Sequence, residues 1–206
     1  PHQPVIYKAD FTDTEFDGHL FIVWIHTDNI RCYVSPDINR KAWPMFTDWL
    51  KSFCTITGSE ECLRTLPPAT CLGTQFKYDN SGLTVSMTPY IEAALNKAGM
   101  TDCNPAPTPM IPGFELHSGM CPDTDNDRIA IVSKVNEIFR TAISNSDIRI
   151  DNYKDATHFY AMLVSTIGWI ANRVGSSIAL AHSILGRVMH APTISAFQAV
   201  KRVFRY

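Results

Sequence analysis

The chain has 206 residues, of which 45% are hydrophobic and 18% charged, with a formal net charge of -2. This size and composition are typical of a globular protein with a sizeable core, in one large domain or two small ones. No apolar stretch approaches the roughly 20 residues that cross a bilayer, and the N-terminal residues lack the pattern of a secretory signal. The sequence therefore predicts an intracellular protein, cytoplasmic or nuclear, with no membrane partner.

The charges are unevenly distributed along the chain. Residues 153–206 carry six Lys and Arg against one Asp, a net charge of +5, which leaves -7 for residues 1–152. A basic C-terminal part on an acidic body favours either contact with a polyanion or attraction between the two parts. The sequence alone does not separate these two interpretations.

The cysteines do not have the spacing of a structural zinc site. None forms a Cys-x-x-Cys pair, and a zinc site is typically built from close pairs of ligands. Free thiols in a reducing compartment are therefore expected. The six are Cys32, Cys54, Cys62, Cys71, Cys103 and Cys121.

The first predicted elements form a hairpin followed by a helix. Apolar runs at 20–25 and 30–34 predict two strands, with Asp28 and Asn29 in the turn between them. Large apolar residues at helical spacing predict a helix over about 38–53, followed by a short strand at 54–57.

A second hairpin is predicted next, with strands at 70–77 and 83–87 joined by a turn rich in Asp, Asn and Gly. Thr88 and Pro89 are typical of a helix start, with Thr88 as N-cap, and Gly99 is a natural C-terminal residue.

The rest of the chain is predicted to be a linker followed by helices. Residues 101–127 are rich in Pro, Gly, Asp and Thr and predict an extended linker. The residues from 153 onward read as helical, with breaks near Gly175 and at 191–192. The architecture is therefore α+β. A further helix is expected from apolar residues at helical spacing: Ile129, Val132, Val135, Ile138, Phe139 and Ala142.

Several short motifs follow one another along the chain: Asp28-Asn29, Leu72-Gly73, Val85-Ser86, Tyr90-Ile91, Gly99-Met100, Cys103, Thr108-Pro109, Tyr160, Leu163-Val164, Arg173 and the terminal run Lys201 to Tyr206. In this order they resemble the C-terminal part of the reverse transcriptase domain of copia-type LTR retrotransposons. Each motif is weak alone, but the order and spacing together cover nearly the whole chain except an apparent insertion at about 128–152.

The resemblance implies a fold and three portions. The fold would be a remnant of a polymerase palm, two β-hairpins with a helix, followed by a mainly helical, thumb-like region. The portions would be palm-like at 1–110, a linker with an inserted helix at 111–152, and a thumb- or connection-like region at 153–206. The family's activity is RNA-directed DNA polymerisation.

That activity uses Mg²⁺ held by several carboxylates, because magnesium prefers hard oxygen ligands. Asp28 and Asn29 would occupy the family's Asp-Asp pair, and Asn29 replaces one carboxylate by an amide. Asp28 alone would be a metal ligand, and only if an upstream carboxylate were supplied; Asp10, Asp13, Glu15 and Asp17 are typical of solvated loop charges. We therefore expect no cofactor and no polymerisation by these 206 residues, and Asp28-Asn29 is equally typical of a plain turn.

Cations of the C-terminal part are the second candidate site. Lys201 and Arg205 share a helix face with Arg202 beside them, and Arg187 and Arg173 extend the strip. By resemblance this region would grip RNA or DNA through phosphates; a solvated cationic face is the plain alternative. The four tryptophans, Trp24, Trp43, Trp49 and Trp169, are predicted to be core residues.

Three roles remain open at this point. The first is a degenerate, inactive reverse transcriptase fragment with weak, non-specific nucleic-acid binding. The second is a domesticated scaffold for a protein partner or a homo-oligomer. The third is a fragment of a longer active polyprotein. Fold resemblance does not choose among them.

Overall fold

The computed structural model describes residues 5–8, 21–26, 29–34, 39–52, 54–55, 69–79, 82–145 and 147–206. The chain divides into two compact units, Pro1–Glu60 and Glu61–Tyr206, which are described separately below. Both strands and helices are present, so the predicted α+β class is confirmed. The three portions with boundaries at 110 and 152 stay a prediction.

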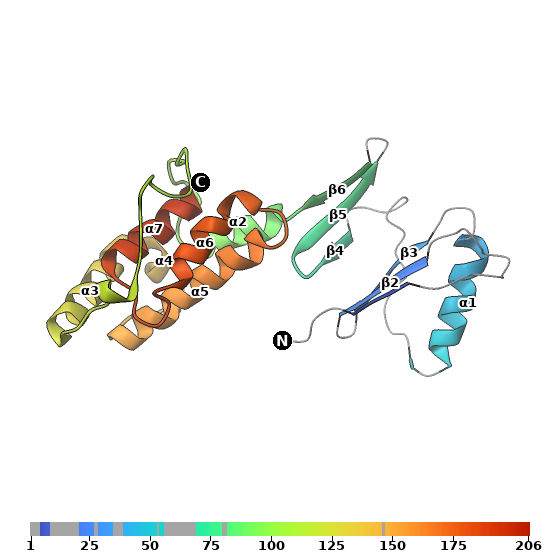
Figure 1. The fold of residues 1–206 in the computed structure, drawn as a ribbon, viewed down its shortest axis with the longest axis horizontal. Coiled ribbons are helices and arrows are strands. Elements are labelled where there is room, and N and C mark those ends of the chain that lie inside the picture. Colours follow the sequence, from blue (N-terminus) through green and yellow to red (C-terminus); the bar gives the residue numbers. More distant parts are fainter. Residues whose placement is uncertain are drawn as a thin grey trace. The chain divides into compact units, whose positions relative to one another are not determined.

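The described residues of the first unit form an antiparallel sheet in the order β1-β2-β3 and one helix. The predicted hairpin is confirmed by β2 (Phe21–His26) and β3 (Asn29–Val34), and the sequence reading missed β1 (Val5–Lys8). Helix α1 (Asn39–Lys51) lies within the predicted 38–53 (Figure 1).

The strand predicted at 54–57 is wrong at its first two residues, which are not extended strand. The amide of Cys54 donates to the carbonyl of Leu50 at 3.2 Å, so this residue completes the last turn of α1. Residues 56 and 57 lie outside the described part of the chain.

The first described elements of the second unit are three antiparallel strands, β4 (Ala69–Cys71), β5 (Thr74–Asp79) and β6 (Gly82–Ser86). The single strand predicted at 70–77 is therefore wrong: a turn at Leu72 and Gly73 divides it. Their φ angles of 51° and 77° lie in the left-handed region that two-residue hairpin turns use. Leucine rarely adopts this conformation, so its side chain gave no turn signal.

Helix α2 (Thr88–Lys97) begins one residue earlier than predicted. Met87 is the N-cap residue and makes no side-chain capping bond, so the prediction that Thr88 caps the helix is wrong. Pro89, predicted at the first helical position, is the second residue of the helix. Gly99 has φ +64° directly after the helix, as the predicted C-terminal glycine requires.

The predicted linker has one short 3₁₀ helix, η1 (Ser118–Met120), and is otherwise irregular up to residue 124. It is nevertheless packed against the helices that follow. Leu116 is fully buried, and the amide of Ala106 donates to the carbonyl of Arg205 at 2.7 Å. Tertiary contacts therefore fix the course of this segment.

Helices α3 (Asp125–Ile138) and α4 (Arg140–Ser144) confirm the helix expected after the linker. Its start is set by a capping box, in which Thr124 and Asp127 each bond the other's backbone. The predicted buried face is partly wrong, because Ile131 is buried whereas Ile129 is 67% exposed.

The C-terminal residues form α5 (Tyr153–Ala171), the 3₁₀ helix η2 (Ser176–Ile178), α6 (Ala179–Gly186) and α7 (Ile194–Arg205). Both predicted breaks are confirmed. Helix α5 contacts α3, α6 and α7, so these four helices share one core. No helix in the described part of the chain is long and apolar enough to cross a membrane.

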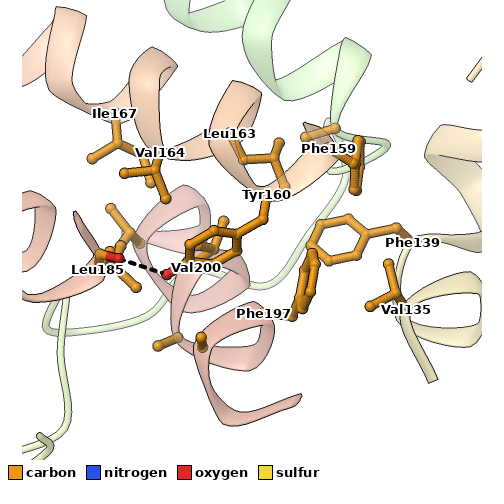
Figure 2. Packing of buried hydrophobic residues seen from close by; sticks show 14 of the residues in the cluster. Val135, Phe139, Phe159, Tyr160, Leu163, Val164, Ile167, Leu185, Phe197 and Val200 are labelled. Carbon is orange, nitrogen blue, oxygen red and sulfur yellow. Dashed lines mark hydrogen bonds between the residues drawn. The ribbon is translucent and has the colours of Figure 1, made fainter. Parts of the chain in front are cut away.

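An aromatic cluster lies at the centre of this core (Figure 2). Phe197 packs edge-on against both Tyr160 and Phe139, with ring centroids 5.1 Å and 6.2 Å apart, a favourable arrangement for aromatic rings. The Tyr160 hydroxyl, fully buried, donates to the carbonyl of Leu185 at 2.9 Å (Figure 2). This bond ties α5 to α6 and satisfies the one polar group of the cluster.

Candidate functional site

The tip of the first hairpin is only partly described. Asn29 is the first residue of β3 and pairs with His26, which confirms the hairpin predicted for the resembled catalytic pair. Asp28 lies outside the described residues, and so do Asp10, Asp13, Glu15 and Asp17. The metal-binding role of Asp28 stays a prediction.

Metal ligands do not gather elsewhere in the described part of the chain, where no three His, Cys, Asp or Glu side chains are placed to hold one ion. The cysteines described there, Cys32, Cys54, Cys103 and Cys121, are free thiols. Burial raises the pKa of the Cys32 thiol from 9.0 to about 11, since the charged form is disfavoured away from water.

Helix α7 presents one apolar and one cationic face. Val200 and Val203 are buried in the core, whereas Lys201, Arg202 and Arg205 are half-buried at its edge. Lys201 and Arg205 therefore share one face of the helix, as predicted from their spacing, and the neighbouring apolar residues Val200 and Val203 face the core. The helix begins at Thr193, whose hydroxyl accepts from the amide of Ala196 at 3.1 Å.

Each of the three cations makes one hydrogen bond to a distant part of the chain. Lys201 Nζ donates to the carbonyl of Ile138 at 3.0 Å, where α3 ends. The guanidinium of Arg202 donates to Thr108 Oγ1 at 2.9 Å, and Arg205 Nε donates to the carbonyl of Asn104 at 2.7 Å. The cations therefore hold the linker segment and α3 against α7.

These bonds leave most of the donors available. A lysine ammonium has three N–H donors and a guanidinium has five. One of the five donors of Arg202, the Nε group, is buried without a hydrogen-bond partner. The three side chains are held in position, and most of their N–H donors make no hydrogen bond within the described part of the chain.

A pocket of about 370 Å³ lies where these side chains meet the linker segment. Its apolar lining comes from Met110, Ile111, Phe114, Ile138 and Ala199. Its polar lining comes from Ser195, Gln198, Lys201, Arg202 and Arg205. One concave site thus combines apolar surface with three positive charges.

No carboxylate in the described part of the chain forms an ion pair with Lys201, Arg202 or Arg205. The ion pairs found there, Arg128–Asp125 at 3.1 Å and Lys134–Glu137 at 2.7 Å, lie within α3. Three like charges around one pocket repel each other, and a bound anion would offset that repulsion. The arrangement is suited to phosphate or carboxylate groups.

The other two predicted cations do not line this pocket. Arg187 is exposed just after α6, and Arg173 is exposed just after α5. The Arg173 guanidinium lies 3.9 Å from the centroid of the Trp169 ring, a cation–π contact. The predicted strip of five therefore resolves into three pocket cations and two exposed ones.

The tryptophans differ in environment from the prediction. Trp49 is 58% exposed on α1, so the expectation that it is a core residue is wrong, while Trp43 and Trp169 are half-buried. The Trp169 indole donates to the carbonyl of Leu72 at 3.3 Å. The side chain of Trp24 is not among those that the structure describes.

Sequence reasoning missed the partners that complete the pocket. Met110, Phe114 and Thr108 lie in the linker, about 90 residues before α7 in the chain. The only available signal was a Pro-rich segment containing large apolar residues, which is unusual in a solvated linker.

No known family model matches this sequence, and no solved structure matches it. The chain is similar to an uncharacterized mitochondrial protein of Arabidopsis thaliana, with 31% identity over 135 residues. The matched part covers 66% of this chain but only 43% of that protein. The chain thus spans less than half the length of this curated relative.

Proposed function

We propose that this chain derives from a copia-type reverse transcriptase domain and contacts nucleic-acid phosphates, without reading sequence, through the cations of α7. The observation that carries the proposal is the pocket with Lys201, Arg202 and Arg205, which have no carboxylate partner in the described part of the chain. The order of elements, two hairpins with a helix and then a helical bundle, supports the derivation. The amide of Asn29, in place of a carboxylate, supports loss of polymerase activity.

Binding of this kind is electrostatic and releases counterions from the nucleic acid. Three phosphate contacts predict affinity that falls about 20-fold for a single strand and about 40-fold for a duplex when salt rises from about 50 to about 200 mM. Filter binding of the purified chain to a duplex and to a single strand at both salt concentrations tests the proposal. No retention at low salt, or retention indifferent to salt, would remove it.

A second candidate function, a docking scaffold for a protein, is favoured by a different observation. Met45 and Trp49 lie one helical turn apart on α1 and are 59% and 58% exposed. Large exposed apolar side chains that adjoin are typical of protein contacts. Light scattering of the chain and of a Trp49→Glu variant tests this function: a dimer that the substitution dissociates supports it, and a monomer at all concentrations argues against self-association.

A further inference from the structure

The pocket on α7 has a mixed chemistry that phosphate contact alone does not need. Three phosphate-binding cations would work equally well on a flat, polar surface. Here they stand beside Met110, Phe114 and Ile138, whose side chains form apolar walls. Its volume of about 370 Å³ lies within the range typical of small-molecule sites, about 300–1,000 Å³.

A nucleotide has three kinds of surface that complement the apolar, polar and cationic groups of the pocket. Its base has a flat apolar face that stacks on aromatic side chains, a polar edge and a charged phosphate. Phe114 offers the aromatic surface, and the exposed Gln198 offers an amide with both donors and an acceptor for a base edge. Arg202 and Arg205 offer unused guanidinium donors for the phosphate.

A base in a duplex is paired and stacked, and moving it into a concave site costs a few kcal/mol. An unpaired base enters without that cost. We propose that the pocket binds one unpaired nucleotide of a single strand, with the base against Phe114 and Met110 and the phosphate on the α7 cations. This inference rests on the proposed nucleic-acid binding and deepens it from phosphate contact to recognition of unpaired nucleotides.

Fluorescence polarisation at low salt, with a labelled single strand and a blunt duplex of equal length, tests the inference. The single strand should bind more tightly, and Phe114→Ala should weaken its binding about 5- to 150-fold, the range expected for one lost base stack. Duplex binding should not change in this variant. Leu180→Ala, which removes a side chain 70% exposed on α6 and outside the pocket, is the matched control and should change neither.

Two further measurements keep the test decisive if Phe114→Ala fails to fold. Gln198→Leu replaces an exposed side chain at the pocket and removes the amide without changing the charge, so it should weaken binding of the single strand and leave duplex binding unchanged. In competition, adenosine monophosphate should displace the strand better than ribose 5-phosphate, which has no base, or adenosine, which has no phosphate.

The outcomes separate this inference from the proposed function. Equal, salt-sensitive binding of single strand and duplex would leave the proposed function standing and overturn the inference. Ribose 5-phosphate competing as well as adenosine monophosphate would overturn it too, since the apolar walls would then contribute nothing. No binding to either nucleic acid would overturn both.

Discussion

Lys201 Nζ lies 3.0 Å from the carbonyl oxygen of Ile138, so a side chain of α7 caps the C-terminal end of α3 across 63 residues of sequence. The last carbonyls of a helix lack partners within it and carry the negative end of the helix dipole. An ammonium group at this place satisfies one of them and is favoured by the dipole.

The first prediction follows from this cap. Lys201→Met should lower the free energy of unfolding by about 1–2 kcal/mol, because it removes a charged hydrogen-bond donor from the C-terminal end of α3. Chemical denaturation followed by circular dichroism measures it. Lys154→Met is the control: Lys154 is exposed in the first turn of α5, where a positive charge is unfavourable, so its loss should cost nothing. Equal destabilisation by both changes would contradict the capping role.

The second prediction concerns Gly99, whose surroundings exclude any side chain. A Cβ there would overlap the backbone nitrogen of Ala142, and the φ angle of +64° is itself unfavourable for other residues. Gly99→Ala should therefore destabilise the chain by more than the roughly 1–2 kcal/mol that the backbone angle alone costs. Gly113 has a similar φ of +74° and open space around it, so Gly113→Ala should show the backbone cost alone. Thermal unfolding of the two variants makes the comparison, which fails if Gly113→Ala is the worse of the two.

The third prediction concerns Tyr160. Tyr160→Phe should lower the free energy of unfolding by about 1–3 kcal/mol, because the buried carbonyl of Leu185 loses its donor. Burial also raises the pKa of the Tyr160 hydroxyl above its ordinary value of 10.0. The folded state therefore holds this proton more tightly than the unfolded state does.

The sign of the pH dependence follows. The contribution of Tyr160 to stability is fully present below about pH 10 and is lost as the pH rises above that value. Unfolding measured between about pH 9 and pH 11.5 should show a steeper fall for the natural chain than for Tyr160→Phe. Parallel curves would show that another group governs alkaline unfolding.

The fourth prediction concerns thiol reactivity. With its pKa raised to about 11, Cys32 holds very little thiolate near neutral pH, and the thiolate is the reactive form. Iodoacetamide at about pH 8 should therefore modify the exposed Cys54 well before Cys32, as followed by peptide mass spectrometry. Faster modification of Cys32 would mean that its surroundings are open to water.

Local patterns in the sequence predicted the helices well. Apolar spacing predicted α1 and α3, the residues from 153 onward were read as helical with breaks after α5 and α6, and Gly99 marked the end of α2. These signals act over a few residues. The turn at Leu72 and Gly73 was missed, since leucine does not favour a positive φ. The indole of Trp169 bonds the Leu72 carbonyl from 97 residues away, a contact that no local pattern shows.

The candidate site was predictable only in part, for the same reason. Helical spacing placed Lys201 and Arg205 on one face, and both do line the pocket. Arg205 also forms hydrogen bonds with Asn104 and Ala106. These bonds depend on the path of the linker, which is determined by tertiary packing and not by local sequence. Asp28 and Asn29 gained no support as a catalytic pair, because the structure does not describe Asp28.

The central claim, that the α7 cations contact phosphates, is tested most directly by the salt dependence of single-strand binding. A plot of log affinity against log salt concentration should have a slope of about -2, and Arg205→Gln should reduce it in magnitude by about 0.7, the value for one lost contact. Arg205→Lys, which keeps the charge, should retain the slope, and so should Lys154→Gln, because Lys154 does not line the pocket. An Arg205→Gln slope equal to that of the natural chain would contradict the account.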